Sequence, residues 1–268
     1  MHWQRVRAIV RKDLTAVRRS RPVLVPLVVL PLIFFVAMPV GFALMGRFLG
    51  EAPDSELEPL IRALPPSDRA QLERLEPGQQ IAVVLLSYQF APLMLIVPLA
   101  VATAIAADSL AGERERRTLE ALLATPIRDE ELFFGKVLAA ALPAIAIGWL
   151  GTFVEVLVAI AVTGVGPPLL PSVPLLILAL LGVPGVAFLG LGAVVLISAR
   201  VRGFQEVMQL SGLLAMPLIG VMVAQASGLF LIDWRLALLG CVVVWAAAFG
   251  ILRAGRRLFQ REALLRLG

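Results

Sequence analysis

Hydrophobic residues run along this chain in stretches long enough to cross a membrane. A helix that rises 1.5 Å per residue needs about 20 apolar residues to cross a hydrocarbon core of about 30 Å. Stretches without Asp, Glu, Lys or Arg cover 22–46, 77–107, 137–154, 156–199, 207–232 and 236–252. Glycines and four prolines between 164 and 174 divide the longest stretch between two spans. The pattern predicts six transmembrane helices, near 23–44, 85–107, 137–162, 175–197, 207–226 and 236–252.

The overall composition agrees with this pattern. Of the 268 residues, 59% are hydrophobic and only 16% are charged, and the mean hydropathy is +0.91. Soluble domains carry about 25% charged residues, so the class of soluble globular proteins is excluded. The predicted fold is an all-α polytopic membrane protein. Its single cysteine, Cys241, rules out an intrachain disulfide.

The basic residues predict how the chain is oriented in the membrane. Of the 24 Lys and Arg residues, 19 fall on the side that holds both termini and the loops after the second and fourth spans. Cationic loops resist translocation, so we expect a multi-pass protein of the cell membrane with both termini in the cytoplasm. The net charge of +5 then indicates contact with anionic membrane lipid and not with nucleic acid.

Residues 1–21 predict an amphipathic helix that precedes the six-span domain of residues 22–268. Trp3, Val6, Val10, Leu14 and Val17 recur at three- and four-residue spacing with Arg and Lys between them. The alternative is a plain basic flank that only fixes the topology. A cleaved signal peptide does not fit, because the following apolar stretch of 25 residues exceeds the 7–15 residues of a signal sequence.

Three polar segments lie outside the predicted spans. Residues 47–76, with seven acidic residues against four Arg, are either a small external cap or a solvated loop. Residues 253–268 form a cytoplasmic tail. In the cytoplasmic segment 108–131, Thr118 can cap a short helix that presents Leu119, Leu122 and Leu123 on one face and ends at Pro126. Such a helix suits docking into a groove of a soluble partner, and its alternative is a solvated loop with salt bridges.

The chain lacks the residues that an ATPase or an intramembrane protease needs. A phosphate-binding loop ends in Gly-Lys-Ser/Thr after an upstream glycine, whereas Gly135-Lys136 lacks that glycine and is followed by Val137. The single histidine, His2, has no partner in sequence for a zinc site or a Ser/His pair. We therefore expect neither an enzyme nor a resident cofactor or metal.

Glu155 is the one acidic residue inside a predicted span. A carboxylate at the bilayer centre costs ~2.5–3.5 kcal/mol, so it must be paired, protonated or in contact with water. Glu155 is a candidate for a translocation path or gate, and its alternative is an acid that snorkels to the external interface. Because ion-coupled secondary transporters bury carboxylates in the membrane, Glu155 leaves such a transporter as an alternative function. A membrane scaffold without transport is a further alternative.

The cytoplasmic segment resembles that of ABC type-2 exporter permeases, the membrane subunits of ATP-binding-cassette exporters. The resemblance rests on Arg11-Lys12-Asp13-Leu14, Glu113-Arg114-Glu115-Arg116, Thr118-Leu119-Glu120, Thr125-Pro126 and Gly135-Lys136. It implies that 1–21 is a connecting helix and that the segment after the second span is a coupling helix. The residues implied to couple to an ATPase are Gly112, Glu113, Arg114, Glu115, Arg116, Thr118, Leu119, Glu120, Leu122, Leu123, Thr125 and Pro126. It further implies two separate ATPase subunits that bind ATP and Mg, and a second permease that is a copy or a paralogue.

Overall fold

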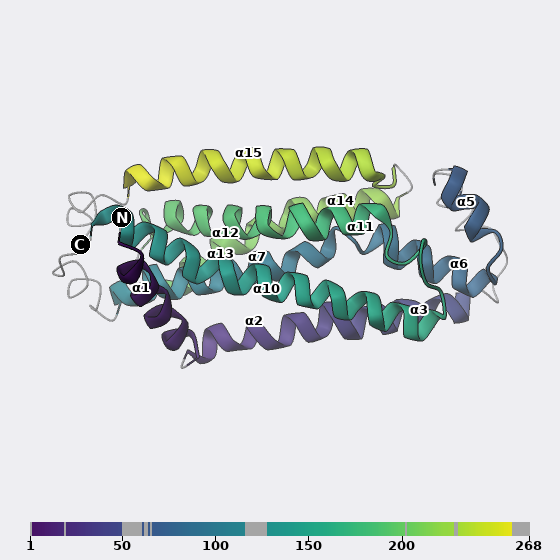
Figure 1. Ribbon diagram of the computed structural model, residues 1–268, viewed down its shortest axis with the longest axis horizontal. Helices are drawn as coiled ribbons and strands as arrows, with labels where there is room; N and C mark the ends of the chain where they lie inside the picture. Colours follow the sequence, from purple (N-terminus) through teal and green to yellow (C-terminus); the bar gives the residue numbers. More distant parts are fainter. Residues whose placement is uncertain are drawn as a thin grey trace.

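A computed structural model describes residues 2–18, 20–49, 61, 64, 66–115, 128–201, 203–227 and 230–258. These residues form an elongated bundle of helices, and no strand occurs in this part of the chain (Figure 1). Six of the helical segments are long and apolar enough to cross a membrane: Val23–Gly46, Leu93–Gly112, Glu130–Thr163, Val173–Ser198, Phe204–Ala226 and Trp234–Gly255. The prediction of an all-α protein with six spans is confirmed.

Each span is built from one or more helical elements. The first half of the chain contains α1 (Trp3–Val17), α2 (Arg21–Leu32), η1 (Ile33–Ala37), α3 (Met38–Leu49), α5 (Pro66–Leu72), α6 (Pro77–Val84), η2 (Leu85–Gln89), η3 (Leu93–Leu95), α7 (Ile96–Ala107), η4 (Asp108–Gly112) and α8 (Glu113–Glu115). The second half contains α10 (Asp129–Thr163), α11 (Val173–Ile177), η5 (Leu178–Gly182), α12 (Val183–Ser198), α13 (Phe204–Gly212), η6 (Leu213–Ala215), α14 (Met216–Ala226) and α15 (Trp234–Leu258).

The second span lies at the centre of the bundle. In its most apolar window, 89% of the residues are buried, against 11–28% in the first, third, fifth and sixth spans. Its α7 packs against α10 and α12, and α12 packs in turn against α15. The outer spans expose Leu, Val and Phe side chains, as a bundle surrounded by lipid does.

The two ends of the bundle differ. Helix α1 lies across the ends of the spans, and the last turn of α15 lies at that same end, whereas α5 lies at the opposite end (Figure 1). We call these the α1 end and the α5 end. Because the chain has six spans, an even number, the start of α1 and the end of α15 lie at the same end of the bundle.

Two predicted span boundaries need correction. The helix of the third span starts at Asp129 and not near 137, because the charged side chains of Glu131 and Lys136 have hydrogen-bond partners elsewhere in the bundle and so do not end the helix. The second span is not one helix from 85 to 107. The helix that leads to it begins at Pro77, widens into the π-turn of η2 and is interrupted before η3, where Pro92 cannot donate a backbone hydrogen bond; the span itself covers Leu93–Gly112.

Candidate functional site

Helix α1 sits on the spans through one apolar face and one acidic residue. Val6, Ile9, Asp13 and Val17 recur at three- and four-residue spacing and are buried, and α1 packs against α10. The contact with α10 is close at Gly135, where an added Cβ would lie 2.8 Å from Cγ2 of Ile9. The glycine of the Gly135-Lys136 pair therefore makes room for α1.

Lys136 is the centre of a buried ion network. Its Nζ donates to the carbonyl oxygen of Ser109 at 2.6 Å, to Oγ of Ser109 at 2.8 Å and to Oε2 of Glu113 at 2.8 Å. All three protons of the ammonium group have an acceptor, which is what a buried lysine requires. Oγ of Ser109 donates in turn to Oδ2 of Asp13 at 2.8 Å, and Oδ2 lies 3.8 Å from Nζ of Lys136. The network joins α1, η4, α8 and α10.

Lys12 completes the network from its exposed side. Its Nζ donates to Oε1 of Glu113 and lies 3.1 Å from Oδ1 of Asp13. Burial lowers the pKa of Lys12, but the hydrogen bond to Glu113 and the charge of Asp13 outweigh this, so the pKa lies above its ordinary value. Two lysines face two carboxylates, so the formal charges of the four side chains balance.

Both ends of α1 are also attached to the bundle. At its start, the backbone N–H of His2 donates to Oε1 of Glu131 at 2.7 Å, and Nη1 of Arg5 lies 3.5 Å from Oε2 of the same carboxylate. After its last turn, Oγ of Ser20 donates to Oδ1 of Asp108 at 3.4 Å. Polar contacts at the start of α1, at its middle and just after its last turn therefore attach this helix to the spans.

The same region is connected to the fifth span. The backbone N–H of Phe204, in the first turn of α13, donates to Oε1 of Glu115 at 2.9 Å. The first N–H groups of a helix have no partner within it, and a carboxylate at this position is also favoured by the helix dipole. Glu115 thus ties the start of segment 108–131 to the fifth span.

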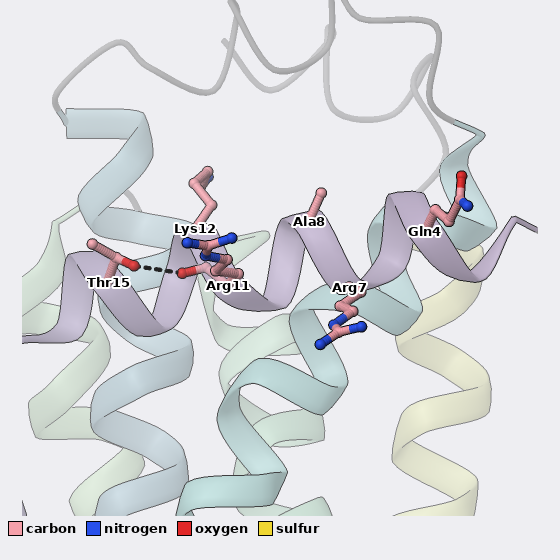
Figure 2. A pocket seen from close by; sticks show the side chains of 6 residues that line it. All are labelled: Gln4, Arg7, Ala8, Arg11, Lys12 and Thr15. Atoms are coloured by element: carbon pink, nitrogen blue, oxygen red, sulfur yellow. Dashed lines mark hydrogen bonds between the residues drawn. The ribbon is translucent and has the colours of Figure 1, made fainter.

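The opposite face of α1 is solvent-exposed and cationic. It lines an open hollow of about 930 Å³, whose described lining residues are Gln4, Arg7, Ala8, Arg11, Lys12 and Thr15. Figure 2 shows Gln4, Ala8 and Lys12 pointing away from the spans, while Arg7 lies on the side nearer to them. Three of these residues are basic and none is acidic. A partner that covers this face has to bring negative charge.

The structure describes only part of the predicted coupling set. Gly112 is buried in η4, and Glu113, Arg114 and Glu115 form α8. Arg116, Thr118, Leu119, Glu120, Leu122, Leu123, Thr125 and Pro126 lie outside the described residues. The predicted cap 47–76 and tail 253–268 are likewise described only in part.

Sequence reasoning did not select Lys12, Asp13, Ser109 or Lys136 as site residues. They are far apart in the chain, and charges beside an apolar stretch look like ordinary flanks. One signal was present, since Lys12, Asp13 and Lys136 fall in two of the strings that carry the family resemblance. In this chain the network brings residues of the two strings into contact.

Glu155 lies inside the bundle and does not snorkel. Its side chain is 2% exposed, and Oε2 has no hydrogen-bond partner among the described residues. One turn earlier, Gly151 faces the ring of Phe35, and Oγ1 of Thr152 lies 3.5 Å from Sδ of Met94. This face of α10 packs against the first and second spans, and the role of Glu155 in a path or gate stays a prediction.

Six spans with a crosswise helix and a buried ion network at one end define a multi-pass membrane protein. The sequence model of the family described as "ABC-2 family transporter protein" matches residues 7–231 of this chain. The chain belongs to that family and is a transmembrane permease component of an ABC transporter. A comparison with curated proteins finds no match.

Proposed function

We propose that this chain is the membrane subunit of an ATP-driven exporter of the cell membrane, with its α1 end in the cytoplasm. Separate ATPase subunits, two per complex, bind ATP and Mg and dock on segment 108–131 and on the exposed face of α1. Spans from this chain and from a second permease, a copy or a paralogue, enclose the path. The observation that carries the proposal is the Lys136 network, which joins the start of segment 108–131 to α1 and α10.

The network and Glu115 support a route for the mechanical step. A force on segment 108–131 reaches α1 and α10 through Glu113 and Lys136, and it reaches α13 through Glu115. ATP can bias the bundle only if the docked segment makes different contacts in the two states of the ATPases. A buried network of hydrogen bonds and ion pairs suits this task, because its members are expected to move together.

The first experiment tests docking. Leu122→Asp places a carboxylate on the predicted apolar face of the coupling helix, and we expect it to abolish co-purification of the ATPase while the chain still inserts into the membrane. Leu57→Asp is the matched control, because it makes the same change in the segment predicted to lie outside, and it should leave co-purification intact. Unchanged co-purification of the Leu122→Asp chain would contradict the coupling role of this segment.

A second candidate function rests on Glu155. A buried carboxylate without a described partner in a membrane helix is typical of ion-coupled secondary transporters. The reconstituted chain distinguishes the two mechanisms. An ATP-driven permease needs its ATPase for any flux, whereas an ion-coupled carrier moves substrate in response to a pH gradient alone and loses this with Glu155→Gln. A scaffold would show neither flux nor stimulation of ATP hydrolysis by substrate.

A further inference from the structure

The fifth span consists of two halves that are attached to the bundle in different ways. Its first half, α13, packs against α7 and α12. Its second half, α14, has its main contacts with η2 and η3, the interrupted part of the second span. Between the halves, the helix tightens in η6, and Pro217 follows in the first turn of α14. A tightened turn next to a proline is a usual place for a helix to bend.

Two glutamines hold the tip of α14 against η2. Nε2 of Gln225 donates to the carbonyl oxygen of Tyr88 at 2.8 Å, and Nε2 of Gln89 donates to the carbonyl oxygen of Met222 at 2.8 Å. The side chains are 0% and 8% exposed, respectively. We call this reciprocal pair of hydrogen bonds the glutamine clasp. Within a membrane bundle there is no bulk water to replace either bond, so the clasp holds the two elements together.

The clasp is nevertheless incomplete. Oε1 of Gln89 and Oε1 of Gln225 are both buried without a hydrogen-bond partner among the described residues. A buried acceptor without a donor is costly, and this cost is relieved when water reaches it. Opening therefore loses two hydrogen bonds and hydrates two unsatisfied acceptors. The closed and open arrangements are closer in free energy than a fully satisfied network would allow.

The element that α14 contacts, η2, is itself held in place by hydrogen bonds to other parts of the chain. The hydroxyl of Tyr88 donates to Oδ2 of Asp68 in α5 at 2.6 Å. Oγ of Ser87 donates to the carbonyl oxygen of Leu169 at 3.1 Å, and Oγ of Ser172 donates to the carbonyl oxygen of Ser87 at 2.9 Å. These bonds anchor η2 to α5 and to the connection after α10. When the clasp opens, α14 is the element that moves.

We propose that Gln89 and Gln225 are positioning residues of the transport cycle, which hold α14 against η2 in this state and release it when the path opens at the α5 end. The inference rests on the proposed function, because the force that opens the clasp comes from the ATPase. The fifth span carries that force, since Glu115 holds its first residue, Phe204, and Gln225 holds its last turn.

The experiment follows the exposure of α14 from the α5 side in the complex with its ATPase. A cysteine is placed at position 222 in a Cys241→Ser chain, because Met222 contributes only its backbone carbonyl to the clasp. A membrane-impermeant thiol reagent should label it slowly without nucleotide and about tenfold faster during ATP hydrolysis, the order of change expected when the two hydrogen bonds of the clasp are lost. Labelling that stays equally slow while the complex hydrolyses ATP would overturn the proposal.

Variants of the glutamines show whether their hydrogen bonds or only the packing of their side chains hold α14 against η2. Gln225→Met keeps the shape but removes the donor, and it should give fast labelling of the cysteine at 222 without nucleotide. Gln209→Met is the matched control, because it makes the same change on an exposed face of the same span, and it should label slowly like the parent. Slow labelling of the Gln225→Met chain would count against the clasp.

A cross-link covers the case in which Gln225→Met does not fold. Cysteines at 89 and 225, joined by a short bifunctional thiol reagent, should reduce ATP hydrolysis at least about fivefold, and cleavage of the link should restore it. Hydrolysis that continues unchanged in the linked complex would show that the clasp need not open. A chain that never associates with an ATPase contradicts the proposed function instead, so the two failures are distinguishable.

Discussion

Lys136 places its ammonium group in the interior of the bundle, where a charge has to be compensated by opposite charges and hydrogen bonds. Its side chain is 6% exposed, and its partners come from three other elements. Removing one member of a buried ion pair costs about 3–5 kcal/mol, because the remaining charges stay buried without compensation. At the scale of a single residue, the stability of the α1 end therefore depends more on Lys136 than on any surface charge of α1.

Lys136→Met should lower the midpoint of thermal unfolding markedly in detergent. Lys12→Met is the control, because Lys12 is 45% exposed and an exposed ion pair is worth about 0–1 kcal/mol. Adding Glu113→Gln to Lys136→Met should recover part of the loss, since it removes one of the two carboxylates that then face Lys12 without Lys136. Equal effects of Lys136→Met and Lys12→Met would contradict the central place of Lys136.

At the scale of elements, the first and third spans meet through a glycine. A Cβ added at Gly151 of α10 would lie 2.1 Å from Cε2 of Phe35 in η1, and Phe35 is 2% exposed. No flexible group separates the two positions, so the ring or the helix has to shift. Such overpacking costs about 1–3 kcal/mol.

Gly151→Ala should therefore lower the unfolding midpoint, and Phe35→Leu in the same chain should restore part of it, because the colliding ring atoms are gone. Gly240→Ala is the control, since nothing lies within 4 Å of a Cβ at that position of α15. There, alanine should be neutral or stabilising by up to about 1 kcal/mol, because it favours helix over glycine. A similar loss at both glycines would argue against a specific contact with Phe35.

The elements also show what the sequence could predict. All six spans are visible in the sequence as long apolar stretches, with Glu155 as the one acidic residue inside a predicted span, because lipid tolerates few unpaired charges. The start of the third span was placed too late, because Glu131 and Lys136 read as a polar flank until their partners are known. The break between η2 and η3 is not visible as a gap in the apolar pattern, since every side chain there is uncharged, and Pro92 is its one signal in the sequence.

At the scale of the whole molecule, the charge asymmetry predicts the orientation. The α1 end carries the basic loops, so we expect it in the cytoplasm. A reporter enzyme active only outside the cytoplasm should be active when fused at residue 60 and inactive at residue 128, and a fluorescent reporter of the cytoplasm should give the opposite pattern. Reversed activities would overturn the orientation and, with it, the placement of the ATPase.

The three attachments of α1 have a consequence for how the chain is made. His2 and Arg5 bind Glu131, and Asp13 depends on Lys136, so these two partners are synthesised more than a hundred residues after the residues they bind. A nascent chain that has inserted only its first two spans thus carries an amphipathic helix whose acidic residue lacks its buried lysine. The contacts of α1 with Glu131 and Lys136 can form only after the start of the third span has been synthesised, so we expect α1 to dock late in the folding of the chain.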